Sequence, residues 1–298
     1  MRRPECGVRQ IVSHLFYIDT HGIIIIKIQK KMKTFRFIGM ALFAALMCVN
    51  FAACSSSDDD PTEEKEEGGV VVSGKKLVKI VGTSKDSSDS ETYTFKYDNK
   101  GRLIEATESY QEGSYKDTDT YQFIWGDDAI KVIINPTYNY TLTLNNGLVE
   151  NSNLDDENGV FTYNNSNRFI KYSSKSKYDT CSAIWDGDKL VSISNYDNEA
   201  TLTYSSSCKK GYFPFIATII TYDADAILFM AHPEIAGMRT NQLPASITWT
   251  DKGYYGTESE TSTMEYEFDK EGYISKIIGK ETDSDGSTDT YTYTLTWQ

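Results

Sequence analysis

Apolar and polar residues alternate with a period of two from Val70 to the C-terminus. In the segment 93–97, for example, three aromatic residues are separated by Thr94 and Lys96. Successive side chains of a strand point to opposite faces of a sheet. The alternation therefore predicts β-strands with one apolar and one solvated face. The same pattern recurs at 121–125, 140–144, 264–268 and 291–297.

Short turn signals punctuate these strands, and a large residue precedes most of them. The turns are rich in Asp, Asn and Gly, which tolerate the backbone conformations of tight hairpins. The large residues recur at a spacing of often about 19 positions, the length of one hairpin plus its return connection. They are Tyr97, Trp125, Leu144, Tyr163, Trp185, Tyr204, Trp249 and Phe268. The intervening connections are longer and more acidic, so we expect short turns at one end of the sheet and long loops at the other.

One segment, residues 211–242, interrupts the alternation. Ala224–Ala231 predicts two helical turns, which end at His232 because the following Pro233 disfavours helix for the residue before it. This insert is the most apolar stretch after residue 70. It is either a connector that re-enters the sheet or a plug that fills the sheet interior.

The elements together predict an all-β fold. We expect an antiparallel up-and-down meander of about sixteen strands of ~6–8 residues, with the short helical insert. Strands of this length are shorter than the ~9–11 residues that span lipid, so the aromatic face should point inward. The meander should close into a flattened or curved barrel, filled by aromatic side chains and the insert. A long sandwich-like sheet is the alternative.

The N-terminal region carries a targeting signal. Lys33 and Arg36 follow Met32 and precede an apolar run to Ala53, so residues 32–53 are typical of a signal peptide. Its end, Phe51-Ala52-Ala53-Cys54, resembles a lipobox, which implies that Cys54 becomes the lipidated N-terminus of a bacterial lipoprotein. Phe51 stands where Leu is usual. Residues 1–31 precede a complete signal and are interpreted as an over-extended start.

The residues after Cys54 form an acidic tether, 54–74. Its beginning resembles the acidic export signal of Bacteroidetes surface lipoproteins. The resemblance implies an outer-membrane lipoprotein exposed at the cell surface, and the periplasmic face is the alternative. The residues of this export signal are Ser55, Ser56, Ser57, Asp58, Asp59 and Asp60.

Composition and charge narrow the classes of partner. Hydrophobic residues make up 39% of the chain, which excludes global disorder. The formal net charge is −13, and the first 53 residues are net basic, so the acidic excess lies in the remainder. Nucleic acid and anionic surfaces need a basic face, so no nucleic-acid partner is expected. The chain is expected to be a monomer held at the membrane by its lipid anchor.

Two family resemblances follow from these segments. The sequence Tyr97-Asp98-Asn99-Lys100-Gly101-Arg102-Leu103 resembles the Tyr-Asp repeat of Rhs-type and teneurin-type proteins, and 269–274 is a weaker echo. The β-meander domain, residues 75–298, resembles a Bacteroidetes lipoprotein domain of unknown function. That resemblance implies a porin-like β fold and brings no catalytic residues.

Residues typical of catalysis are scarce after the signal segment. His232 is the single histidine there, and beside Pro233 it is expected to be structural. Cys181 and Cys208 should lie at opposite ends of the sheet, beyond the ~7 Å limit for a disulfide. Without a His or Cys cluster, no zinc site is expected, and no phosphate or dinucleotide loop indicates a cofactor.

One loop has weak calcium character. Asp283, Asp285 and Asp289 surround Gly286 as the acids of a calcium loop do, although Thr294 stands where an EF-hand would place its closing Glu. The alternative is a solvated acidic loop.

The sequence therefore favours a surface-anchored, non-catalytic binding module for a glycan or another extracellular ligand. Trp125, Trp185 and Trp249 recur near strand ends, where they could stack on sugar rings; alternatively they form a rung of the core. A structural or adhesive envelope protein is the second hypothesis. A glycoside hydrolase is less favoured, because acid pairs arise easily by chance in so acidic a chain.

Overall fold

The computed structural model describes residues 74–298 except 86, 136–137, 155–157, 176–179, 197, 221–222, 252–256 and 284–285. The signal peptide, Cys54 and the export signal lie outside the described residues, and so does Asp285. The assignments made for them remain predictions.

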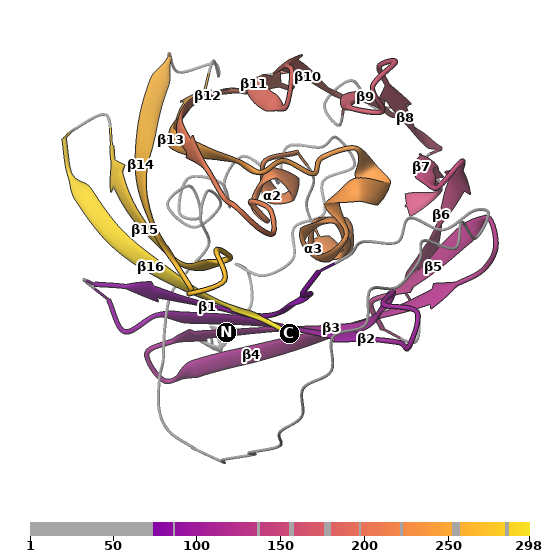
Figure 1. Cartoon of the computed structure of the whole chain (residues 1–298), viewed down its shortest axis with the longest axis horizontal. Helices are drawn as coiled ribbons and strands as arrows, with labels where there is room; N and C mark the ends of the chain where they lie inside the picture. The colour runs from indigo at the N-terminus through magenta and orange to yellow at the C-terminus, as the bar shows by residue number, and fades with distance from the viewer. Residues whose placement is uncertain are drawn as a thin grey trace, which may run out of the picture. The chain divides into compact units, whose positions relative to one another are not determined.

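The described residues form sixteen strands, and each strand pairs antiparallel with its neighbours in the chain. The last strand pairs with the first, for example Leu295 opposite Ile80, and this closes the barrel (Figure 1). The predicted fold class is therefore confirmed, but the expected strand length is wrong. Seven of the described strands have 9–11 residues, so strand length does not distinguish this barrel from one that spans lipid. The strands are β1 (Leu77–Ser84), β2 (Ser90–Tyr97), β3 (Leu103–Glu112), β4 (Tyr115–Trp125), β5 (Ala129–Ile133), β6 (Asn139–Asn145), β7 (Leu148–Ser152), β8 (Gly159–Tyr163), β9 (Phe169–Ser173), β10 (Cys181–Asp186), β11 (Lys189–Ser194), β12 (Asn198–Ser207), β13 (Gln242–Asp251), β14 (Glu258–Phe268), β15 (Ile274–Thr282) and β16 (Thr288–Trp297).

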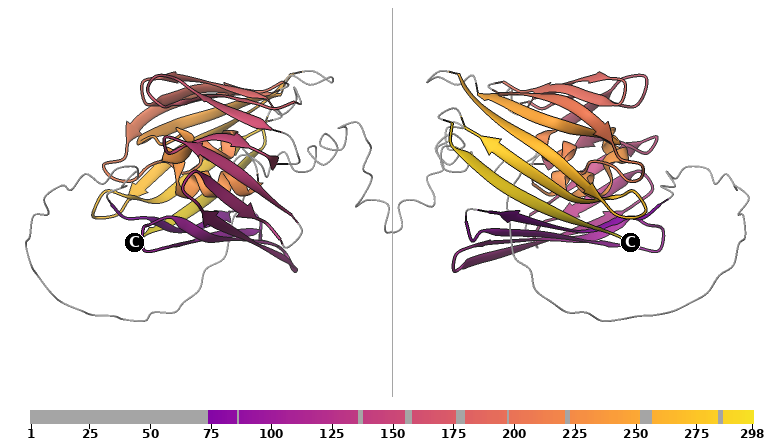
Figure 2. Two further views of the ribbon diagram at one scale, coloured as in Figure 1. Left: turned by 90° about the vertical axis from the view of Figure 1, so that its right-hand side faces the viewer. Right: turned by 60° about the vertical axis from the view of Figure 1, so that its left-hand side comes forward.

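The alternation in the sequence matches the two faces of the barrel wall. Along β16, Tyr293 and Leu295 are buried in the lumen, whereas Thr294 and Thr296 are exposed outside. Across the strands, the outward positions carry mostly Thr, Ser, Lys and Glu, with scattered apolar residues such as Ile184. A barrel that spans lipid has the opposite pattern, an apolar outer band. The strands run obliquely around the lumen (Figure 2).

Three of the short turns share one geometry. Asp98, Asn164 and Asp269 each accept hydrogen bonds from the backbone N–H groups two and four residues later, at 2.9–3.0 Å. The residue three positions later has a positive φ: 75° at Gly101, 57° at Asn167 and 95° at Gly272. Glycine and asparagine adopt this conformation with the least strain. The Tyr-Asp motif and its echo therefore encode the same turn.

The insert leaves the sheet after β12 and returns at β13, although these two strands pair directly with each other. It contains α2 (Ile216–Ile220), α3 (Asp223–Ala231) and the 3₁₀ helix η4 (Pro233–Ala236), and α2 and α3 lie inside the ring of strands (Figure 1). Phe229 packs edge-on against Phe161 of β8, and Phe215 packs against Tyr293 of β16. Of the two interpretations, the structure shows the plug. Among the described residues, no helix has the length and apolarity needed to cross a membrane.

Candidate functional site

The large residues before the short turns form a series of hydrogen-bonded latches. In each case, a Tyr or Trp of an even-numbered strand donates its ring O–H or N–H to a backbone carbonyl of the preceding odd-numbered strand, at 2.6–2.9 Å. The two strands of each pair are joined by a loop at the long-loop end of the barrel. The latch therefore holds the same two strands together at the short-turn end, where no turn connects them. The donors and acceptors are Tyr97 to Leu77, Trp125 to Leu103, Tyr163 to Val149, Trp185 to Phe169, Tyr204 to Leu190, Tyr266 to Pro244 and Trp297 to Ile274.

The structure does not keep the three stacking candidates together. Trp125 and Trp185 are half-buried latch residues at the short-turn end, whereas Trp249 lies near the long-loop end of β13, opposite Glu260 of β14. Guanidinium groups already cover two of the rings: Arg102 lies 5.9 Å from the Trp125 centroid and Arg168 lies 5.1 Å from that of Trp185. Sugar stacking on these rings stays a prediction.

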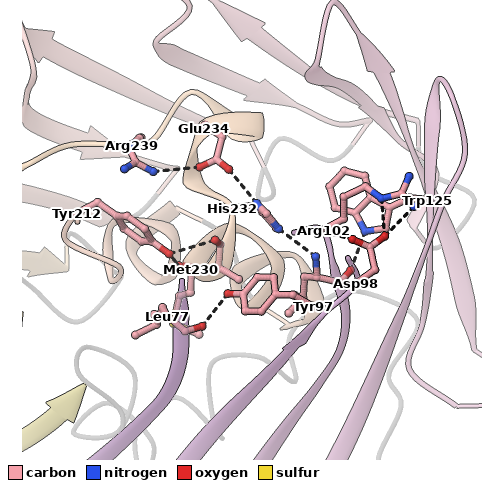
Figure 3. A network of polar contacts seen from close by, with 12 residues as sticks. Leu77, Tyr97, Asp98, Arg102, Trp125, Tyr212, Met230, His232, Glu234 and Arg239 are labelled. Atoms are coloured by element: carbon pink, nitrogen blue, oxygen red, sulfur yellow. Dashed lines mark hydrogen bonds and ion pairs between the residues drawn. The ribbon is translucent and has the colours of Figure 1, made fainter. Parts of the chain in front are cut away.

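His232 ties the plug to the wall (Figure 3). Its Nε2 accepts the backbone N–H of Leu103 at 3.0 Å, so its proton lies on Nδ1, which donates to Glu234 Oε1 at 2.8 Å. The carbonyl of the same Leu103 accepts the Trp125 latch. Both ring nitrogens are thus engaged in holding α3 and η4 against β3, which is a structural role.

Glu234 continues this network toward the short-turn end. Its Oε2 lies 3.5 Å from Nη1 of Arg239, whose guanidinium stacks over Tyr212 at 4.9 Å from the ring centroid (Figure 3). Burial alone would raise the pKa of Glu234, but the hydrogen bond from His232 and the neighbouring Arg239 outweigh it and lower the pKa. The carboxylate therefore stays ionised and holds Arg239 at the edge of a cavity.

That cavity, here called the basic cavity, has a volume of about 630 Å³ and lies at the short-turn end. Four cationic side chains and one carboxylate line it: Arg168, Lys209, Lys210, Arg239 and Asp188. Arg168 pairs with Asp188 and also donates to the backbone carbonyl of Arg239. The two lysines are exposed.

One aromatic ring also lines the basic cavity. Tyr273 contributes a ring with the Lys210 ammonium 5.9 Å from its centroid. Asn241, which is exposed, supplies an amide to the same lining. Tyr273 is only 4% exposed, so the groups open to a ligand are the cations and the amide. Together these suit an anionic ligand that also presents hydroxyl groups.

A second group of polar residues faces the lumen near the long-loop end. The Tyr93 hydroxyl donates to Glu91 Oε1 and lies 3.1 Å from Glu108 Oε1, and Tyr121 donates to Glu108 Oε2 at 3.1 Å. Burial and the charge of Glu108 raise the pKa of Glu91 well above its ordinary value, and burial raises the pKa of Glu108. A glycosidase leaves space for a sugar between its two carboxyl groups. Here the Tyr93 hydroxyl occupies that space, so the geometry does not favour this chemistry.

The structure does not bring the calcium candidates of the sequence together as one group. Asp283 lies with Glu260 and Glu281 in a group whose ligand oxygens are all within 4.8 Å of one another. Asp289 is the strand partner of Glu281, and Asp285 lies outside the described residues. Sequence reasoning missed the two glutamates, although both occupy inward positions of their strands, where an acid is unusual. The alternation along each strand, which places both glutamates on the inward face, was the signal available in the sequence.

Neither Cys181 nor Cys208 is in a disulfide, and both are buried. Burial raises the pKa of the Cys181 thiol to about 11 and also raises that of Cys208. A thiol rather than a thiolate is a poor nucleophile, so neither residue has the character of a catalytic cysteine.

No protein-family model matches the sequence, and no curated protein matches it. Solved structures do resemble its fold. A porin-like protein from Bacteroides uniformis aligns with a TM-score of 0.58 at 17% identity, covering 74% of this chain and 98% of that one. A porin-like protein from Bacteroides vulgatus aligns with a TM-score of 0.49 at 14% identity, covering 76% and 99%. The likeness to the first shows a shared fold, an antiparallel barrel of the porin-like type.

Proposed function

We propose that this protein is a non-enzymatic, lipid-anchored protein of the bacterial outer membrane that captures acidic glycans in the basic cavity. The observation that carries the proposal is the cavity itself. Arg168, Lys209, Lys210 and Arg239 converge there in a chain whose net charge is −13. A cationic recess on an acidic protein selects a ligand that carries negative charge.

The chemistry of the lining points to a glycan among anionic ligands. Guanidinium groups bind carboxylates and sulfates through paired hydrogen bonds. The exposed Asn241 amide can bind sugar hydroxyls. Uronic acids and sulfated sugars carry both an anionic group and hydroxyl groups.

The barrel wall supports a role other than transport. The insert fills the lumen, with Leu228 and Phe229 fully buried, and the outward face is mostly polar. A pore across lipid needs an open lumen and an apolar outer band. We infer that the barrel stands outside the bilayer and is held there by the predicted lipid on Cys54, at the cell surface.

Binding to arrays of neutral and acidic glycans tests the proposal, with the chain produced from Ser55 onward so that it lacks the lipid. We expect acidic glycans to bind and neutral ones of the same backbone not to. The double variant Lys209→Ala/Lys210→Ala should weaken binding by about tenfold or more, equivalent to ~1.4 kcal/mol. Binding should also weaken with added salt, because the charges are near the surface.

Lys116→Ala/Lys131→Ala is the matched control, since both lysines are exposed on the outer wall away from the cavity. It should leave glycan binding unchanged. An equal loss of glycan binding in both double variants would show that the effect comes from overall charge and not from the basic cavity. If no glycan binds at all, the alternative of a structural or adhesive envelope protein becomes the better explanation.

A further inference from the structure

Three carboxylates converge at the long-loop end of the barrel, at the opposite end from the basic cavity. Glu260 comes from β14, Glu281 from β15 and Asp283 from the connection between β15 and β16. Their ligand oxygens all lie within 4.8 Å of one another. The register explains the meeting, because Glu281 pairs with Ser262, the next inward residue of β14 after Glu260. We call these three residues the carboxylate cluster.

Glu281 has a buried carboxylate oxygen that no hydrogen bond satisfies. The side chain is buried, at 2% exposure. Its Oε2 accepts the Tyr291 hydroxyl, whereas its Oε1 has no hydrogen-bond partner. A buried carboxylate oxygen without a partner is strongly unfavourable, and two neighbouring carboxylates make it more so. A bound cation would satisfy the oxygen and offset the repulsion.

We propose that the carboxylate cluster binds a calcium ion. The donors are all carboxylate oxygens, which select hard cations over zinc or copper. Calcium accepts carboxylates in flexible arrangements, whereas magnesium requires near-octahedral geometry and keeps most of its water. Asp283 is held in place by its loop, since the Ser287 hydroxyl donates to Asp283 Oδ2 at 3.0 Å and the Asp283 N–H donates to the Ser287 carbonyl at 3.0 Å.

The ion would connect β14, β15 and the loop that leads into β16. This is the last part of the wall before the chain closes onto β1. Calcium binding therefore stiffens the long-loop end next to the closing seam. The carboxylate cluster shares no residue with the basic cavity. The calcium proposal is therefore tested independently of glycan binding.

Terbium luminescence provides the direct test, because Tb³⁺ substitutes for Ca²⁺ and is excited through a nearby indole. Trp249 is the strand partner of Glu260 and is placed to serve as that donor. We expect the full chain in detergent to show Tb³⁺ emission that Ca²⁺ displaces. Glu281→Gln and Asp283→Asn should each weaken Ca²⁺ binding by about tenfold or more.

Glu265→Gln is the matched control, since Glu265 lies on the same strand as Glu260 but points outward and is exposed. It should bind Ca²⁺ as the unaltered chain does. Thermal unfolding gives a second readout: Ca²⁺ should raise the melting temperature of the unaltered chain and of Glu265→Gln relative to EDTA, and should not shift that of Glu281→Gln. In EDTA, Glu281→Gln should melt no lower than the unaltered chain, because the substitution removes a buried charge.

Three results would each overturn the proposal. The first is a chain that shows no Ca²⁺-displaceable emission and no shift in melting temperature with Ca²⁺. The second is undiminished Ca²⁺ binding in both Glu281→Gln and Asp283→Asn. The third is displacement of Tb³⁺ by Mg²⁺ as effectively as by Ca²⁺, which would leave a nonspecific acidic surface.

Discussion

Glu91 shows how a single buried acid sets the pH dependence of stability. The residue is only 5% exposed. Burial and the charge of Glu108 raise its pKa well above the ordinary 4.5. The folded chain thus holds this proton more tightly than the unfolded chain. The stabilising contribution is complete below the unfolded pKa and is lost as the pH rises through the folded pKa.

We therefore predict that Glu91→Gln flattens this dependence and stabilises the barrel near neutral pH. Glutamine keeps the shape and cannot ionise, and each unit of pKa difference is worth about 1.4 kcal/mol. Urea unfolding at about pH 5 and about pH 7.5 measures the effect. The exposed Glu265→Gln serves as the control and should keep the slope of the unaltered chain. A Glu91→Gln slope equal to that of Glu265→Gln would contradict the prediction.

At the scale of the elements, the buried side chains of the insert should contribute strongly to the stability of the barrel. Leu228 and Phe229 of α3 are both 0% exposed, and Phe229 contacts Phe161 across the lumen. We predict that Leu228→Ala and Phe229→Ala each lower the free energy of unfolding by ~2–5 kcal/mol, the range for large buried side chains. Urea denaturation followed by circular dichroism measures both.

The comparison variant for the insert is Ile184→Ala on β10, whose side chain is 63% exposed on the outer wall. It should change stability by no more than about 0.5 kcal/mol. Near-neutral values for both insert variants, with the β signal intact after proteolysis of the insert, would mean that the sheet closes its interior without the plug.

The strands could be predicted from the sequence because one face of each is buried, and burial enforces a period of two. The recurrence of large residues before the turns could also be predicted from the sequence, because most units place a Tyr or Trp latch near this position. The role of each large residue could not be predicted. Leu144 has no hydrogen-bond donor in its side chain, and Tyr266 rather than Phe268 donates to Pro244. A pattern of size does not distinguish a hydrogen-bond donor from an apolar ring.

The candidate sites were harder to predict than the elements. The basic cavity joins Arg168 and Lys210, which lie on turns far apart in the chain and meet only because the barrel closes. The carboxylate cluster likewise depends on the register between β14 and β15. A single sequence indicates which face of its strand a residue occupies. It does not indicate which residue of the neighbouring strand lies opposite. Asp283 was identified from its loop, whereas its two partners were not.

At the scale of the whole molecule, the barrel closes where the described chain begins and ends. Lys76 and Gln298 exchange backbone hydrogen bonds at 2.5 and 2.8 Å. Gly74, the first described residue, lines the basic cavity. A chain of n residues spans at most ~3.3–3.6 Å × n, so the predicted tether 54–74 limits this end of the barrel to within about 75 Å of the membrane.

The attachment itself should depend on one residue. We predict that Cys54→Ala abolishes acylation and moves the protein from the membrane fraction to the soluble fraction. Cys54 precedes the strands in the sequence, so circular dichroism should be unchanged. The mostly polar outer wall offers little apolar surface to hold the barrel in lipid, so the protein should leave the membrane. Palmitate labelling and fractionation measure this, and Ser57→Ala, in the same tether, should behave as the unaltered chain. A Cys54→Ala protein that still carries the label and still sediments with membranes would show that another part of the chain makes the attachment.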